Sequence, residues 1–274
     1  MKKIILLITL VLLSYQARSE DKIDIFVVRG LIRSLEYSFD NNEVLKLALK
    51  EKLGKDLELH SLDLAGNGRL FQEESPTNIE GMIEKLKVQY LEKKREGSKA
   101  YMIAISLGGM IGINWLNTYE GDFEKAFIFN SSLPKFCGMF ERLRPSAITT
   151  LLSGVLSSDP EYKESQIFKI IINHKDKNKN LCKSWAEVSK KMPVSFSNTL
   201  RQLWAALWSP NPEKVKTPLY IGVSETDQMV SSDCSKRMAK AWELPLFIHP
   251  TAGHDILNDD PKWMAEIVSK ELSR

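Results

Sequence analysis

Cysteine is scarce in this chain of 274 residues, which contains only Cys137, Cys182 and Cys234. Their spacing does not fit a metal site, and we expect neither a metal nor a cofactor. Three cysteines allow one disulfide, and Cys137 with Cys182 is the expected pair because both lie between residues 131 and 216; three free thiols are the alternative. None of the three has the sequence setting of a catalytic nucleophile.

A membrane-spanning apolar run is lacking as well. Residues 4–13 are apolar except for Thr9, but this run is short for a hydrocarbon core of about 30 Å. Two lysines precede it, and the small residues Ala17 and Ser19 follow it, which is the pattern of a secretory signal peptide cleaved before Glu20. We therefore expect residues 1–19 to be a signal peptide and the mature protein to be exported, periplasmic or secreted. The alternatives are an uncleaved N-terminal anchor and a buried strand. An uncleaved anchor would be the protein's one contact with a membrane.

An excess of charge of one sign is lacking in the expected mature chain. The full sequence has 38 Lys and Arg against 35 Asp and Glu; three of the bases and none of the acids lie in the first 19 residues, which leaves 35 of each. A neutral chain offers no basic surface to a nucleic acid, so we expect no such partner. The lysine-rich run at residues 175–179 is interrupted by Asp and Asn and is interpreted as a solvated loop.

The sequence does have a regular alternation of strand-like and helix-like segments. Short apolar, β-branched runs predict strands, and amphipathic stretches between them predict helices. The predicted strands span residues 23–28, 57–64, 100–105, 125–130, 218–223 and 246–249, and the predicted helices span 41–55, 77–94, 106–117, 232–244 and 260–272. This alternation is typical of an α/β protein, with a mainly parallel six-stranded sheet and helices on both faces.

One interval, residues 131–216, departs from this alternation. It contains two helical patterns, at 147–156 and 197–207, and loops that include Asp159-Pro160 and the lysine-rich run. We interpret it as a helical cap, or lid, inserted between the fourth and fifth strands. The core domain would then comprise residues 20–130 and 217–274.

The sharpest local motif is Ala104-Ile105-Ser106-Leu107-Gly108-Gly109, at the end of the third predicted strand. A serine between small residues at a strand-to-helix turn can adopt a strained backbone that exposes its hydroxyl above the sheet. The motif resembles the G-x-S-x-G nucleophile elbow of the α/β-hydrolase family, with alanine in place of the first glycine. The resemblance extends from residue 23 to the C-terminus except for the predicted cap, and it implies a serine hydrolase with Ser106 as the nucleophile.

A serine nucleophile needs a base, most often histidine, and the sequence has four histidines. His254, in the run Ala252-Gly253-His254 after the last strand, has the setting of the family's catalytic histidine. His249, at the end of that strand, is its main rival. His60 and His174 are interpreted as packed or exposed residues without a catalytic role.

The third member of such a triad is an acid that orients the histidine. Asp227 follows the fifth predicted strand in a segment that resembles the family's acid loop; Glu225 and Asp233 are the alternatives. The order Ser106, Asp227, His254 is the order found in α/β-hydrolases. Each of the three follows a strand, at the carboxyl edge where ligands of open α/β sheets bind.

The resemblance also implies an oxyanion hole. The expected donors are the backbone N–H of Leu107, the residue after the nucleophile, and that of Leu31, on the loop after the first strand. Relatives commonly have His-Gly where this chain has Arg29-Gly30. Arg29 is interpreted either as a prop that holds this loop by hydrogen bonds or as a cation that binds an acidic group of the substrate.

Two further features are assigned from weaker patterns. The turn at residues 63–68 is similar to a turn of capped hydrolases and is given a structural role. Aromatic residues of the predicted cap, among them two tryptophans four residues apart on one helix face, are candidates to line an acyl pocket or to pack the cap: Phe136, Phe140, Trp204 and Trp208.

Together these features predict hydrolysis of a carboxylic ester through an acyl-enzyme intermediate, with a small acyl compound as substrate. An aminopeptidase or a thioesterase of the same fold is the alternative. An aminopeptidase would need acidic residues for the substrate's amino group, for which Glu161, Glu164 and Glu187 are available. A non-catalytic binding protein that retains the fold is a second alternative.

Overall fold

The computed structural model describes residues 22–54 and 56–274, so the predicted signal peptide lies outside the described residues. In this part of the chain six strands form one sheet in the order β2-β1-β3-β4-β5-β6, and all neighbouring strands are parallel. The strands are β1 (Lys22–Val28), β2 (Asp56–Leu62), β3 (Lys99–Ile105), β4 (Lys125–Phe129), β5 (Leu219–Ser224) and β6 (Leu246–His249). The predicted parallel six-stranded sheet is confirmed, and every predicted strand ends within two residues of the observed one.

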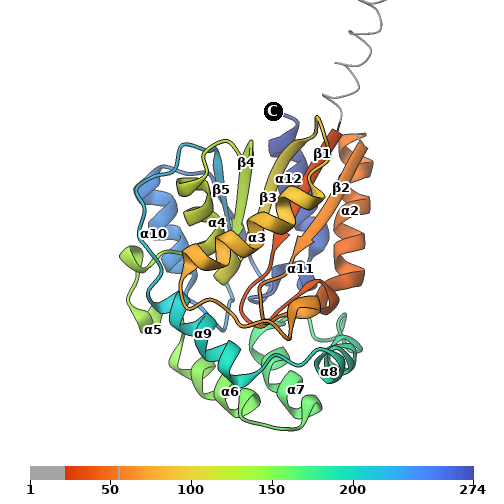
Figure 1. Cartoon of the computed structure of the whole chain (residues 1–274), viewed down its shortest axis with the longest axis vertical. Coiled ribbons are helices and arrows are strands. Elements are labelled where there is room, and N and C mark those ends of the chain that lie inside the picture. Colours follow the sequence, from red (N-terminus) through yellow and green to blue (C-terminus); the bar gives the residue numbers. More distant parts are fainter. Residues whose placement is uncertain (1–21, 55) are drawn as a thin grey trace, which may run out of the picture.

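Helices cover both faces of the sheet (Figure 1). On one face lie α2 (Phe39–Leu53) and α12 (Pro261–Leu272), and on the other lie α3 (Ile79–Lys93), α4 (Leu107–Thr118) and α10 (Ser232–Trp242). Successive residues of β1 alternate between the two cores: Ile25 packs with α2 and α12, whereas Phe26 packs with α3 and α4. A strand buried on both faces is mostly apolar, and in β1 only Lys22 and Asp24 are charged.

The shorter elements join this framework. They are the 3-10 helices η1 (Leu35–Ser38), η2 (Gly68–Leu70) and η3 (Pro134–Phe136) and the single turn α11 (Ile256–Asp259).

Two helices begin or end at residues whose chemistry favours a helix end. The Asn78 side chain accepts the N–H of Gly81 at the start of α3, and Gly54 ends α2 with φ 59°, a left-handed conformation that glycine adopts without strain.

Five helices lie between β4 and β5 in the sequence and cover the carboxyl ends of the strands (Figure 1). They are α5 (Met139–Arg142), α6 (Pro145–Val155), α7 (Pro160–Ile171), α8 (Leu181–Lys191) and α9 (Phe196–Leu207). Helices α6 and α9 correspond to the two predicted patterns, whereas α7 and α8 were not predicted. The Asp159-Pro160 pair, interpreted as a loop, begins α7 instead: Asp159 accepts the N–H of Glu161, and proline fits the first helical turn.

The disulfide joins Cys137 to Cys234, so the expected pairing of Cys137 with Cys182 is wrong. Cys137 lies on the segment after β4, and Cys234 lies in the first turn of α10, after β5. Because β4 and β5 are neighbours, the two Cα atoms come within 5.5 Å, which a disulfide can bridge. Cys182 lies in the first turn of α8 and is a free thiol.

No helix in the part of the chain that the structure describes combines the length and the apolar character needed to cross a membrane.

Candidate active site

Ser106 occupies the sharp turn between β3 and α4. Its backbone has φ 57° and ψ −124°, a strained conformation for a residue with a side chain. Two hydrogen bonds hold the turn: the N–H of Ser106 donates to the carbonyl of Phe129 (3.0 Å), and the hydroxyl of Ser131 donates to the carbonyl of Ser106 (2.6 Å). The strain is thus maintained by β4, and it places the serine at the carboxyl edge of the sheet.

Two glycines allow neighbouring backbone to approach this turn. A Cβ atom on Gly108 would lie 2.3 Å from the carbonyl oxygen of Val28, and one on Gly30 would lie 2.9 Å from the Cβ of Ser106. Neither distance is tolerable for a side chain, so both positions require glycine. The loop after β1 can therefore pack directly against the serine.

The structure brings Ser106, His254 and Asp227 into one chain of hydrogen bonds. Nε2 of His254 lies 2.8 Å from Oγ of Ser106, and Nδ1 of His254 lies 2.7 Å from Oδ2 of Asp227. His254 and Asp227 are buried, whereas Ser106 is partly exposed. When Nδ1 donates its proton to the carboxylate, Nε2 is free to accept the proton of the serine hydroxyl.

Asp227 is held in place by its own loop. Its Oδ1 accepts the N–H groups of Met229 (2.8 Å) and Val230 (2.9 Å), which leaves Oδ2 for His254. Burial lowers the pKa of His254, but the charge of Asp227 and the hydrogen bond to it more than offset this effect, so the pKa lies above its ordinary value. The site is therefore suited to stabilising a positively charged imidazole at His254.

The rival residues are engaged elsewhere. Nδ1 of His249 accepts the N–H groups of Thr251 (3.2 Å) and Ala252 (2.9 Å), so His249 shapes the turn that leads to His254. The other candidates have local partners: His60 contacts Asp24, His174 contacts Thr251, and Glu225 and Asp233 contact Lys236.

Asn130, which the sequence analysis did not single out, joins the loops that carry His254 and Asp227. It follows β4 with φ 45°. Its amide nitrogen donates to the carbonyl of His254 (2.8 Å) and to Oγ of Ser224 (3.1 Å), and its Oδ1 accepts the N–H of Ser224 (2.7 Å). Because Ser224 ends β5 just before Asp227, one buried side chain fixes both loops.

The N–H groups of Leu31 and Leu107 have no acceptor among the described residues. Both residues are buried and line the same cavity as Ser106. A buried N–H without an acceptor costs free energy, and these two groups are available to a ligand. The arrangement is suited to binding a negatively charged oxygen next to Ser106.

The position of Leu31 depends on a residue of α9 that the sequence did not reveal. The N–H of Ile32, whose φ is 51°, donates to Oε1 of Gln202 (3.0 Å). Gln202 is fully buried, and its Nε2 donates to Oδ1 of Asn67 (2.8 Å) and to Oγ of Ser75 (3.0 Å). The turn at residues 63–68, which includes Asn67, thus supports the loop of Leu31 through α9.

Arg29 is turned toward Asp255. Its two terminal nitrogens lie 3.1 Å and 2.7 Å from the carboxylate oxygens, and both side chains are buried. Burial raises the pKa of Asp255, but the charge of Arg29 more than offsets this and holds the pKa below its ordinary value. The pair ties the loop after β1 to the segment after His254, which favours the role of Arg29 as a prop over contact with a substrate.

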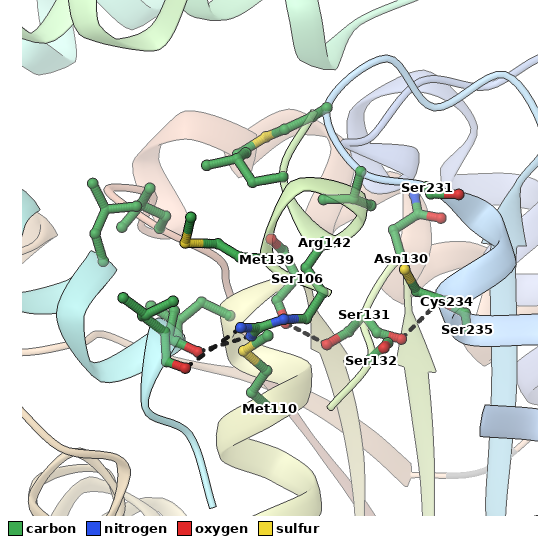
Figure 2. Close-up of a pocket in the computed structure, with 18 of the residues that line it drawn as sticks. Ser106, Met110, Asn130, Ser131, Ser132, Met139, Arg142, Ser231, Cys234 and Ser235 are labelled. Atoms are coloured by element: carbon green, nitrogen blue, oxygen red, sulfur yellow. Dashed lines mark hydrogen bonds between the residues drawn. The ribbon is translucent and has the colours of Figure 1, made fainter. Parts of the chain in front are cut away.

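A cavity of about 240 Å³ lies beside Ser106 (Figure 2). Its walls come from the loop after β1, α4, α5, α9 and the loop of Asp227, and they are largely apolar, with Leu31, Met110, Met139, Leu203, Leu207 and Met229 among them. For comparison, an apolar cavity of roughly 150 Å³ holds benzene. The site can therefore enclose an apolar group larger than one ring.

The structure does not bring Trp204 and Trp208 to this cavity. Their side chains are 56% and 66% exposed, whereas Leu203 and Ala206 of the same helix line the cavity. The four-residue spacing does place the two rings near each other, with centroids 5.8 Å apart, but on the outer side of α9. Two other cap aromatics are also outside the lining: Phe140 is exposed, and Phe136 packs against Trp242.

Within residues 22–54 and 56–274, no group of three or more His, Cys, Asp or Glu side chains is placed to hold a metal ion.

An all-parallel sheet covered by helices on both faces, with a serine, a histidine and an aspartate joined at its carboxyl edge, defines an α/β-hydrolase. Residues 52–261 match the family described as serine aminopeptidase, S33, and the chain belongs to that family. No curated protein sequence matches the chain.

Solved structures share this fold over nearly the whole chain. A lipase-esterase related protein from Clostridium acetobutylicum is 17% identical, with a TM-score of 0.65, and the match covers 92% of this chain and 95% of that one. The esterase RhEst1 from Rhodococcus sp. is 14% identical (TM-score 0.67; 92% and 90% covered). The RedJ thioesterase from Streptomyces coelicolor is also 14% identical (TM-score 0.61; 91% and 85% covered). At these identities the likeness establishes the α/β-hydrolase fold.

Proposed function

We propose that this hydrolase cleaves carboxylic esters through an acyl-enzyme intermediate. The observation that carries the proposal is the hydrogen-bonded chain from Ser106 through His254 to Asp227, beside an apolar cavity. A serine hydroxyl is a weak nucleophile on its own, and a histidine held by a buried carboxylate is the usual means of activating it.

In the first half of the reaction, Oγ of Ser106 attacks the ester carbonyl while its proton passes to Nε2 of His254. The carbonyl oxygen becomes negatively charged and is bound by the N–H groups of Leu31 and Leu107. When the tetrahedral intermediate collapses, the bond to the alcohol breaks, and His254 gives its proton to the departing oxygen. Ser106 then carries the acyl group as an ester.

In the second half, a water molecule takes the place of the alcohol. His254 accepts a proton from the water, and the resulting hydroxide adds to the acyl carbonyl. Collapse of this second intermediate releases the carboxylic acid, and the proton on His254 returns to Ser106. Asp227 keeps the imidazole oriented and stabilises its charged form in both halves.

The wall of the cavity argues against an aminopeptidase. Such an enzyme needs an acidic group to bind the ammonium of its substrate, but no carboxylate occurs among the described residues that line the cavity. The three acids considered from the sequence are engaged elsewhere: Glu164 is buried beside Arg33, and Glu161 and Glu187 pair with Lys190.

The test is hydrolysis of p-nitrophenyl esters from acetate to palmitate by the purified protein and by Ser106→Ala. We expect activity that disappears in the variant, with an optimum at medium chain length because the cavity is bounded. A fluorophosphonate probe should label the protein but not Ser106→Ala. Equal ester hydrolysis by both proteins, or a folded protein that neither cleaves these esters nor is labelled, would contradict the proposal; thioesters and aminoacyl amides would then be assayed.

We also propose that the protein acts after export from the cytoplasm. The signal-like pattern of the first 19 residues and the disulfide between Cys137 and Cys234 support this, because disulfides persist in oxidising compartments. N-terminal sequencing of the protein from its native host should find Glu20 as the first residue. An intact N-terminus on a cytosolic protein would refute export.

A further inference from the structure

Arg142, at the end of α5, is the one charged residue among the described residues that line the cavity beside Ser106. In Figure 2 its side chain extends from α5 across the cavity toward two carbonyl oxygens. These belong to Ala206 (3.0 Å) and Leu207 (3.4 Å), the last two residues of α9. The remaining nitrogen, Nε, is buried and has no hydrogen-bond partner in the part of the chain that is described.

Arg142 differs from the other two arginines near the site because no carboxylate of the described residues pairs with it. Arg29 lies 2.7 Å from the carboxylate of Asp255, and Arg33 lies 3.0 Å from that of Glu164. For Arg142, burial lowers the pKa, and no carboxylate of the described residues offsets this effect. A guanidinium remains protonated even so, so the wall of the cavity contains a partly desolvated cation without a counter-ion.

The contact with the carboxyl end of α9 offsets part of this positive charge. The carboxyl end of a helix carries roughly half a negative charge, and arginine there is favourable. A guanidinium has five N–H donors, however, and the two carbonyls accept from two of its three nitrogens. Both charge and donors therefore remain for a ligand.

We propose that Arg142 binds a carboxylate at the far end of the substrate's acyl chain, so that the preferred substrates are half-esters of dicarboxylic acids. The inference rests on the proposed ester hydrolysis and defines its substrate class. The acyl chain is assigned to this cavity because Ser106 and the N–H groups of Leu31 and Leu107, which would hold the ester carbonyl, form part of its wall. An apolar cavity with one partly buried cation fits a chain of methylene groups that ends in an anion.

The test compares p-nitrophenyl hexanoate with the mono-p-nitrophenyl ester of adipic acid, which has the same chain length and a terminal carboxylate. We expect the protein to prefer the adipate half-ester in kcat/KM by about tenfold or more, and Arg142→Gln to abolish this preference. Glutamine can still donate to the carbonyls of α9, so the change removes the charge with little loss of support. The ratio between substrates is the readout, because their intrinsic reactivities are the same for every variant.

Arg144→Gln is the matched control. Arg144 lies two residues further along, donates to the carbonyl of Val230 and is not part of the cavity wall, so its variant should keep the preference. If Arg142→Gln lowers both rates equally, Arg142 serves only to hold α9, and the proposal is overturned. A hexanoyl ester of a carboxylated nitrophenol places the anion on the alcohol part of the ester instead of the acyl chain. The proposal is also overturned if the protein prefers a carboxylate only in that substrate.

Binding to Ser106→Ala separates this inference from the proposed reaction. Titration calorimetry of the two esters with that variant needs no turnover. Tighter binding of the adipate half-ester that is lost in Ser106→Ala/Arg142→Gln would support the carboxylate site even if the protein hydrolysed no ester. Equal binding of both esters would refute the site even if hydrolysis were established.

Discussion

The side-chain oxygen of Gln202, on α9, accepts the backbone N–H of Ile32, on the loop after β1, at 3.0 Å. Ile32 is a β-branched residue with a positive φ, a conformation that needs support from its surroundings. Leu31, the neighbouring residue, offers one of the two N–H groups proposed to bind the oxyanion. A helix inserted between β4 and β5 therefore shapes the proposed oxyanion hole.

We predict that Gln202→Met lowers kcat for ester hydrolysis by about tenfold to a hundredfold with a smaller change in KM. Methionine keeps the approximate shape but removes the acceptor for Ile32, so the N–H of Leu31 would lose its alignment. Steady-state kinetics with the best p-nitrophenyl ester measures this change.

Asn198→Leu is the control for that prediction. Asn198 lies one turn earlier on α9, is also buried, and also binds the core, through the N–H of Ser75 and the carbonyl of Glu73. It does not bind Ile32. A fall in kcat of the same size in both variants would mean that α9 acts through general stability and does not position the oxyanion hole.

The pKa of His254 predicts the dependence of activity on pH. The proposed mechanism needs neutral His254, and the charge of Asp227 raises its pKa despite the opposing effect of burial. Activity should therefore rise with pH, through a midpoint above the ordinary value for histidine, as the imidazolium loses its proton. A profile of kcat/KM against pH tests this, and a midpoint clearly below the ordinary value would contradict it.

Removing the charge of Asp227 should change both the rate and this profile. In Asp227→Asn the imidazole loses its anionic partner and its favoured tautomer, for which we expect a loss of about a thousandfold to ten-thousandfold in kcat. The residual activity should have its midpoint at lower pH. An unchanged midpoint would show that another group controls the profile.

Asn130 should act as a positioning residue. Asn130→Ala removes the hydrogen bonds to Ser224 and to the carbonyl of His254, and we expect the free energy of unfolding to fall by about 1–3 kcal/mol. We also expect a loss of kcat that remains at temperatures where the variant is fully folded. Urea unfolding and kinetics on the same preparation distinguish the two effects; normal kcat in a destabilised variant would limit Asn130 to a structural role.

The disulfide should contribute strongly to stability. It closes a loop of 97 residues, so Cys137→Ser/Cys234→Ser is expected to lower the free energy of unfolding by about 2–5 kcal/mol. Cys182→Ser, which changes the free thiol, should have a small effect. Equal unfolding midpoints in urea for the double variant and the unchanged protein would show that the bond contributes little.

The three residues of the proposed triad could be singled out from the sequence because each lies in a short motif directly after a strand. Parallel strands place their carboxyl ends at one edge, so Ser106, Asp227 and His254 were expected to meet without knowledge of side-chain packing. The boundaries of the central strands were predictable because strands buried on both faces are apolar over most of their length.

Gln202 and Asn130 could not be found in this way. Gln202 accepts a hydrogen bond from Ile32, which is 170 positions away in the sequence, and Asn130 donates one to His254, which is 124 positions away. Contacts at such separations leave no local pattern. The disulfide was predicted wrongly because Cys137 and Cys182 lie in the same insertion. The pairing of β4 with β5 instead brings Cys234 next to Cys137. The start of α7 was missed because Asp159-Pro160 is compatible with both a loop and a helix start.

The bond between Cys137 and Cys234 encloses α5 to α9, and with them the exposed lysine-rich loop at residues 175–179. A trypsin-like protease that cuts this loop would divide the polypeptide into two fragments, with one cysteine of the pair in each. The fragments would remain covalently joined, and the cut would lie far along the chain from Ser106, Asp227 and His254. The protein would then be a two-chain molecule that migrates as a single species on a gel until a reducing agent separates it.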